Sequence, residues 1–142
     1  MLRAWAQGRS LDNRHQRAED FLPQRLRTFL PDLFDELDTL ARVHSTHVGE
    51  DGSARLLVAL ADGQTVESVL LPRDGVCVST QVGCAVGCVF CMTGRAGLLR
   101  QIGSAEIAAQ VVLARRRRTV KKVVFMDMGE PAHNLDNVLE AI

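Results

Sequence analysis

The stretch Cys84-Ala-Val-Gly-Cys88-Val-Phe-Cys91 places three cysteines close together, shortly after the strand-like segment Val76-Cys77-Val78-Ser79. A closed structural zinc site or a simple electron-transfer cluster normally takes four protein ligands. Three thiolates on a four-iron cubane instead leave one iron open to a small molecule. The spacing therefore favours an iron–sulfur site that takes part in chemistry.

Downstream of this motif the sequence predicts a helix and a second strand. The helix begins near Ser104, a residue type that suits an N-cap, and its apolar residues share one face (Ile107, Val111 and Ala114). The apolar run 123–126 is typical of a strand buried on both faces. A strand, loop, helix and strand in this order predict a parallel pair with a right-handed crossover. Gly129-Glu130-Pro131 follows the second strand, so we expect it near the cysteine motif, at the carboxyl ends of the strands.

Upstream of the motif we expect a helix and a small antiparallel meander. The first 20 residues are polar and irregular, and Pro31 opens a helix with apolar residues at helical spacing (Leu33, Phe34, Leu37 and Leu40). Turn-rich segments separate three strands at 43–48, 54–60 and 65–71. The predicted layout is thus α/β: an irregular segment and helix (1–42), a meander (43–75) and two β/α units (76–142).

The cysteine motif has two other interpretations. The thiols could hold zinc with His133 as a fourth ligand, or they could be ordinary core cysteines. The segment after the second strand favours the iron–sulfur site, because an ordered Glu130 carboxylate could accept hydrogen bonds from the amine of a methionine that chelates the open iron. A generic turn is the alternative for that segment.

At this point the chain resembles the radical S-adenosylmethionine (SAM) enzymes, and more narrowly the ribosomal RNA adenine C2-methyltransferases of the RlmN/Cfr type. The segments that carry the resemblance lie between Asp51 and Ile142: Glu67-Ser-Val-Leu-Leu-Pro72, Cys77-Val-Ser-Thr-Gln-Val-Gly-Cys84, Phe90-Cys-Met-Thr-Gly94 and Met128-Gly-Glu-Pro131. The resemblance implies a partial (β/α) barrel, of which this chain would hold the amino-terminal part.

The resemblance also implies cofactors and residue roles. Cys84, Cys88 and Cys91 would bind a [4Fe-4S] cluster, and Gly129 with Glu130 would hold the methionine end of SAM. Cys77 matches the family's second catalytic cysteine, which releases the product by a disulfide with a methyl-carrying cysteine. Glu67 matches the family's proton acceptor. The implied substrate is 23S ribosomal RNA, with transfer RNA as a second possibility, and a flavodoxin or ferredoxin would supply the electron. Without the resemblance, Cys77 would be a buried strand cysteine and Glu67 a solvated carboxylate.

Composition narrows the partners and the location. Seventeen basic residues balance seventeen acidic ones, so any RNA contact must come from a local patch. The run Arg115–Arg118 is expected at the end of a helix, away from the cysteine motif, where it is solvated or complements the helix dipole. Neither a signal peptide nor a membrane-spanning run is visible, so we expect a cytoplasmic protein without membrane contact. In that compartment cysteines serve as metal ligands or catalytic thiols.

Two departures from the family pattern limit the expected activity. Asp127 stands where the family usually has glycine, and its carboxylate could repel that of bound methionine. The sequence also stops at Ile142, so we expect this polypeptide to be inactive on its own. The alternatives are an iron–sulfur or zinc module without catalysis, and a radical SAM enzyme of another specificity, including methylation at adenine C8.

Overall fold

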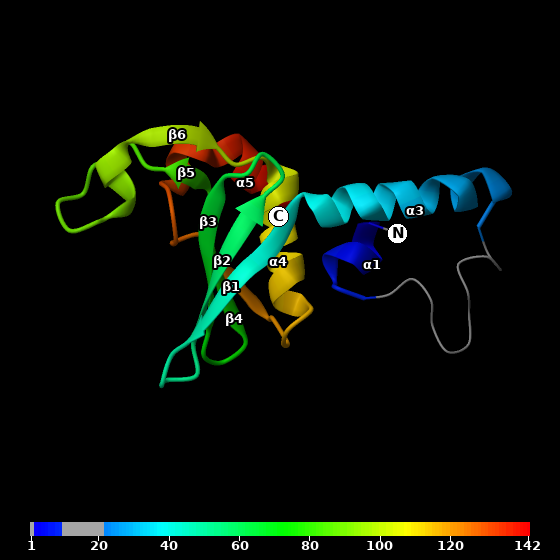
Figure 1. The fold of residues 1–142 in the computed structure, drawn as a ribbon, viewed down its shortest axis with the longest axis horizontal. Helices are drawn as coiled ribbons and strands as arrows, with labels where there is room; N and C mark the ends of the chain where they lie inside the picture. Colours follow the sequence, from blue (N-terminus) through cyan, green and yellow to red (C-terminus); the bar gives the residue numbers. More distant parts are fainter. Residues whose placement is uncertain (1, 10–21) are drawn as a thin grey trace.

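A five-stranded sheet forms the centre of the computed structural model, which describes residues 2–9 and 22–142 (Figure 1). Its strands lie in the order β1-β2-β3-β4-β7. The pairs from β1 to β4 are antiparallel, and β4 pairs with β7 in parallel. The strand bounds are Ala41–Val48 (β1), Ala54–Leu60 (β2), Thr65–Leu71 (β3), Gly75–Val78 (β4) and Lys122–Val124 (β7).

The meander strands follow the alternation of the sequence. Along β2 every second residue is buried, because one face of the sheet packs on the core and the other does not. The predicted strands 54–60 and 65–71 are confirmed at both ends, and the first strand begins two residues earlier than expected, at Ala41. These strands pair directly with β4, so the meander and the parallel pair belong to one sheet.

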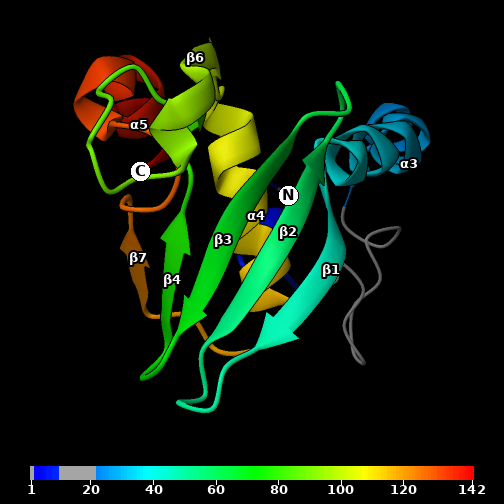
Figure 2. The same ribbon diagram turned by 60° about the vertical axis from the view of Figure 1, so that its left-hand side comes forward.

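Helix α4 (Ser104–Arg115) connects the parallel strands and covers one face of the sheet (Figure 2). Seven of its residues are buried, from Ile107 to Ala114 with the exception of Ala108. They pack with strand residues that are fully shielded from water (Leu56, Val58, Val66, Val76 and Val78). The predicted mixed α/β fold and its crossover helix are therefore confirmed, and the hydrophobic core lies between α4 and the sheet.

The amino-terminal region differs from the expectation in two ways. Helix α3 spans Gln24–Thr39, so it begins before Pro31, and that proline lies inside the helix. Leu30 is the one buried residue of this helix, and Leu26, Phe29 and Leu30 continue the apolar spacing toward its amino terminus. The expected irregular start also contains a short helix, α1 (Leu2–Ala6). The prediction for 10–20 lies outside the described residues.

Two further strands form a small antiparallel pair above the sheet: β5 (Gln81–Gly83) and β6 (Leu98–Gln101). A 3-10 turn, η1 (Thr93–Ala96), precedes β6. After β7 the chain forms a second such turn, η2 (Pro131–Asn134), and helix α5 (Leu135–Ala141). No helix among residues 2–9 and 22–142 has the length and apolar character needed to cross a membrane.

Candidate functional site

The cysteines lie in a loop that is anchored only at its base. We call residues 84–97 the cysteine loop. The strands β5 and β6 pair on either side of it, and the backbone N–H of Cys84 donates to the carbonyl of Gly97 across 3.1 Å. Gly83 has a φ of +77°, and a Cβ there would collide with the same carbonyl. A glycine is therefore required where the loop leaves β5.

The thiols of the cysteine loop are at least partly accessible to water. Cys84 and Cys91 are half-buried, Cys88 is exposed, and none of the three thiols is in a disulfide. Hydrogen bonds from the side chain and backbone of Thr93 hold the pKa of Cys91 below its usual range. Large apolar side chains of the same loop face water (Val86, Val89, Phe90 and Met92).

The three thiols suit an iron–sulfur cluster by their chemistry and by sharing one loop. Within the described part of the chain, no three His, Cys, Asp or Glu side chains are grouped so that they could hold a metal ion. The donor atoms are thus present in the loop without being gathered around one point.

The segment after β7 packs against the base of the cysteine loop. The carbonyl of Met128 accepts hydrogen bonds from the N–H groups of Thr80 and Gln81 at 2.8 and 3.2 Å. The N–H of Glu130 donates to Oε1 of Gln81 across 2.8 Å. Gly129 has a φ of +101°, and a Cβ on it would lie 2.5 Å from Cβ of Gln81. The two motifs therefore meet at Gln81, beyond the carboxyl ends of β4 and β7.

The Glu130 carboxylate lies beside this junction. Its Oε1 accepts a hydrogen bond from the N–H of Ala132 at 3.1 Å, so it caps the turn η2. The side chain is half-buried and retains further lone pairs, since a carboxylate has about four acceptor positions.

Glu67 and Cys77 share the face of the sheet opposite α4. Cys77 pairs with Val69, two residues beyond Glu67 on β3, and side chains two apart on a strand lie on the same face. The two residues are therefore diagonal neighbours on adjacent strands. In Figure 2 the helix α4 lies behind the sheet, so this face is the one turned toward the viewer.

Asp127 joins this pair from the segment after β7. Burial raises the pKa of the Cys77 thiol, and the negative charge of Asp127 raises it further. Burial and the neighbouring Glu67 raise the pKa of Asp127 to about 6, while Arg55 acts in the opposite direction. Arg55 in turn pairs with Glu67 at 3.5 Å. The site thus contains two carboxylates, one thiol and one guanidinium.

Sequence reasoning did not identify Arg55, Gln81 or the place of Asp127 in this site. Strand register could have found Arg55, because it pairs with Val69 and therefore lies on the same face as Glu67 and Cys77. Gln81 gives no such signal, since its contacts depend on how the segment after β7 folds back.

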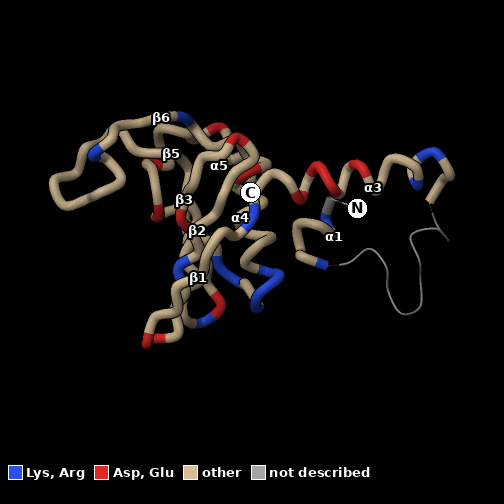
Figure 3. The backbone as a smooth tube through the Cα atoms, in the orientation of Figure 1, with Lys and Arg blue, Asp and Glu red and all other residues tan. Residues whose placement is uncertain are grey.

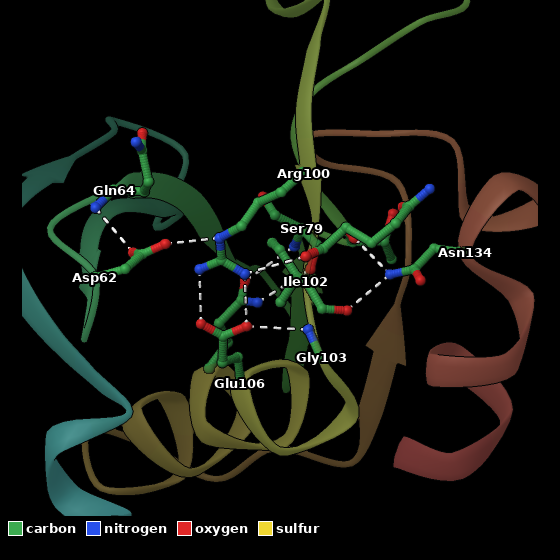
Figure 4. Close-up of polar contacts among 11 residues, drawn as sticks. Asp62, Gln64, Ser79, Arg100, Ile102, Gly103, Glu106 and Asn134 are labelled. Carbon is green, nitrogen blue, oxygen red and sulfur yellow. Dashed lines mark hydrogen bonds and ion pairs between the residues drawn. The ribbon is translucent and has the colours of Figure 1, made fainter.

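A polar network holds β6 and η2 around the site (Figure 4). Arg100 makes two hydrogen bonds to Glu106, at 2.8 and 2.9 Å, and one to Asp62 at 2.7 Å. Glu106 also accepts from the N–H of Gly103 and so closes the start of α4. The Asn134 side chain donates to the carbonyls of Thr80 and Ile102. These contacts fix both ends of the cysteine loop to the core.

Comparisons with known proteins agree with the motif content. No family model matches the chain. Probable RNA methyltransferases of Thiobacillus denitrificans, Azoarcus sp. and Pseudomonas aeruginosa are 83%, 78% and 73% identical to it, and each match covers 100% of the chain. Over its full length the chain is similar to proteins named probable RNA methyltransferases. It spans 39%, 41% and 42% of the length of these three relatives.

A solved structure gives the same indication. The crystal structure of a radical SAM methyltransferase from Sphaerobacter thermophilus matches with a TM-score of 0.72 and 40% identity. The match covers 87% of this chain and 38% of that protein. At this identity, the likeness extends beyond the arrangement of the elements to the sequence that forms them.

The arginine run lies far from the cysteine loop. Figure 3 shows basic residues at the end of α4, at the opposite end of the sheet from the cysteine loop. Arg115 and Arg118 donate to backbone carbonyls of Ala6, Gly52 and Leu71. Arg116 pairs with Asp38 at 2.7 Å. Three of the four arginines therefore stabilise the fold.

Proposed function

We propose that the chain forms the amino-terminal part of a radical SAM enzyme that methylates C2 of an adenine in 23S ribosomal RNA. The observation that carries the proposal is the junction at Gln81. There the Gly129-Glu130 segment packs against the base of a loop that carries three thiols. In parallel α/β folds, ligands bind beyond the carboxyl ends of the strands, where this junction lies. The proposal includes a cytoplasmic location and a partial barrel that begins with β4, α4 and β7.

In this proposal Cys84, Cys88 and Cys91 hold a [4Fe-4S] cluster, and Gly129 and Glu130 bind the methionine end of SAM. The bound groups would supply a deoxyadenosyl radical after reduction by a flavodoxin or ferredoxin. The loop would gather its thiols around the cluster, and its exposed apolar side chains would shield the cluster from water. Glu130 has acceptor positions to spare for the methionine amine.

The open face of the sheet would supply the acid–base and thiol chemistry. Glu67 would take the proton from the adenine carbon, and the Arg55 guanidinium lies 3.5 Å from its carboxylate. Cys77 would release the product by attack of its thiolate on the sulfur of a methyl-carrying cysteine. A disulfide then forms, the carbon–sulfur bond breaks, and its electron pair with a proton completes the methyl group. Transfer RNA is a second substrate to test with the same assay.

Anaerobic reconstitution of the chain with iron and sulfide tests the cluster site. We expect a brown chain with about four iron atoms, and loss of the colour when any one of Cys84, Cys88 and Cys91 is replaced by alanine. The Cys77→Ser variant is the matched control, because the fourth cysteine lies on the sheet and should not affect iron content.

Two outcomes would contradict the cluster site. One is a colourless chain that binds zinc in place of iron, which would favour a zinc module. The other is an equal loss of iron from the Cys77→Ser variant. Addition of SAM to the reduced cluster should also change its electron paramagnetic resonance spectrum, because SAM would occupy the open iron. An unchanged spectrum would contradict the proposed cofactor.

A further inference from the structure

Two glutamines on the stems of the cysteine loop face each other. Gln81 begins β5, just before the loop, and Gln101 ends β6, just after it. The two residues are direct partners in the pair of strands, so their side chains lie on the same face of it. Nε2 of Gln81 donates to Oε1 of Gln101 across 2.9 Å. The two amides therefore link the strands on either side of the loop.

The hydrogen bonds continue from both glutamines to the segment after β7. Oε1 of Gln81 accepts from the N–H of Glu130 at 2.8 Å, and Nε2 of Gln101 donates to the carbonyl of His133 at 2.9 Å. Glu130 and His133 are themselves joined, because the N–H of His133 donates to the carbonyl of Glu130 at 3.0 Å. The glutamine pair thus holds the turn η2 at Glu130 and again at His133.

The two amides connect these points in one orientation. A backbone N–H can only donate and a backbone carbonyl can only accept, so the two ends of this series of hydrogen bonds are of opposite kind. Each glutamine amide accepts through its oxygen and donates through its nitrogen, so the pair joins the two ends head to tail. Gln81 is fully shielded from water, where an amide without both partners would be costly. The contacts therefore set the orientation of both side chains.

The glutamine pair also sets the place of the Glu130 carboxylate. Oε1 of Glu130 accepts from the N–H of Ala132 at 3.1 Å, so the carboxylate is tied to the turn η2. That turn is held by Gln81 and Gln101. Gly129 packs directly on Gln81, which leaves little room for the turn to shift. The position of the carboxylate therefore depends on two amides outside its own segment.

We propose that Gln81 and Gln101 form an amide clamp that positions Glu130 to receive the methionine amine of SAM. This inference rests on the proposed function, because that function assigns Glu130 to SAM. Both glutamines are positioning residues: Gln81 contacts Glu130 directly, and Gln101 acts on it through Gln81 and η2. The clamp joins the two stems of the cysteine loop, so it holds the amine acceptor at a fixed place relative to the base of the loop.

Hydrogen exchange of the Glu130 backbone amide, followed by NMR in the metal-free chain, tests the clamp. In the parent chain this amide should be protected, since it is bonded to the buried Gln81. Gln101→Glu keeps the shape of the side chain and removes its donor, so an acceptor would face the carbonyl of His133. We expect this variant to exchange the Glu130 amide about tenfold faster, which corresponds to about one net hydrogen bond.

Gln64→Glu is the matched control, because Gln64 is exposed in the turn between β2 and β3 and the described residues show no hydrogen bond for its side chain. Amides of β2 and β3 are the internal reference, since their rates should stay the same in both variants. Gln101→Met has a similar length and no charge, should act in the same direction, and decides the question if Gln101→Glu does not fold.

Two exchange results would overturn the inference. One is an unchanged Glu130 rate in the Gln101 variants, which would mean that Gln81 holds Glu130 without help. The other is an equal acceleration of the β2 and β3 amides, which would indicate a general loss of stability in place of a clamp.

The reconstituted chain gives a second readout. Gln101→Glu should retain about four iron atoms, since it removes no thiol, and it should bind SAM about tenfold more weakly in a titration followed by electron paramagnetic resonance. A purely structural role would lower the midpoint of urea unfolding and leave the SAM affinity unchanged. That result would remove the positioning role.

The two proposals can fail separately. A parent chain that takes up no iron, or whose cluster does not respond to SAM, would contradict the proposed function, while the exchange rates would still decide whether the clamp exists. Equal SAM affinity of the parent chain and Gln101→Glu would keep the proposed function and overturn only the inference drawn from the clamp.

Discussion

At the scale of single residues, Gly129 packs against Gln81 where the two motifs meet. Its φ of +101° is a conformation that side chains disfavour, and the space where a Cβ would lie is already taken by Gln81. A side chain at position 129 would therefore be disfavoured twice, by the backbone conformation and by the collision with Gln81. Gly63 offers a comparison, because its φ of +84° also disfavours a side chain but no atom lies within 4 Å of an added Cβ.

We expect Gly129→Ala to lower the free energy of unfolding by about 3 kcal/mol, and Gly63→Ala by about 1 kcal/mol. The difference reports the collision with Gln81, since both variants carry the backbone strain. Urea unfolding with unchanged slope measures both values. Equal losses in the two variants would show that Gln81 moves aside at no cost, and would contradict a rigid junction between the motifs.

At the scale of elements, α1 depends on α4 for its position. A helix of five residues is unstable alone, so its docking must come from tertiary contacts. Trp5 is only 6% exposed, and Arg115 donates to the carbonyl of Ala6 at 2.5 Å. This single tryptophan makes the docking visible, because indole fluorescence depends on contact with water.

Replacement of Arg115 by glutamine should release α1. We expect the tryptophan emission to shift to longer wavelength, while the far-ultraviolet circular dichroism of the sheet stays the same. Arg117→Gln is the control, since the described residues show no side-chain hydrogen bond for Arg117. Unchanged emission from the Arg115 variant would mean that the burial of Trp5 alone holds the helix.

The elements that the sequence predicted well are those with a strong local pattern. The strands β2 and β3 alternate between core and surface and are bounded by Gly52 and Gly63, both at positive φ, so their ends could be located. The start of α3 was missed because Pro31 resembles a first-turn proline, although Leu26, Phe29 and Leu30 continue the apolar helical spacing before it.

The strands β5 and β6 and the surroundings of the site could not be predicted for a different reason. Gln81–Gly83 is too short to show alternation, and its partner lies beyond the cysteine loop. The pairing of Glu67 with Arg55 follows from register, which the meander pattern contained, whereas the place of Asp127 depends on the hydrogen bond from Met128 to Ser79. Long-range contacts of this kind leave no trace in local sequence.

At the scale of the whole molecule, Asp127 makes stability depend on pH. Its pKa is about 6 in the folded chain and 3.8 without the fold, so the folded state binds the proton more tightly. The charge therefore destabilises the fold above about pH 6, and this penalty shrinks as the pH falls toward 3.8. At neutral pH the penalty is about 2 kcal/mol, allowing for partial exposure to water.

We therefore expect Asp127→Asn to be more stable than the parent chain at pH 8, and the advantage to disappear at about pH 4. Urea unfolding across this range measures the difference. Other carboxyl groups weaken the fold in acid, such as Glu106, where hydrogen bonds from Arg100 and Gly103 outweigh burial and lower the pKa. They are present in both chains, so they cancel. A difference that is constant with pH would contradict the buried charge.

The anchoring of the cysteine loop at its base affects how the protein would respond to oxygen. No residue from 84 to 97 belongs to the hydrophobic core, so the scaffold can fold before any metal arrives. In the proposed enzyme, oxygen that destroyed the cluster would leave a folded protein with an open loop. Such a protein could be repaired by fresh iron and sulfide, and it would not have to be synthesised again.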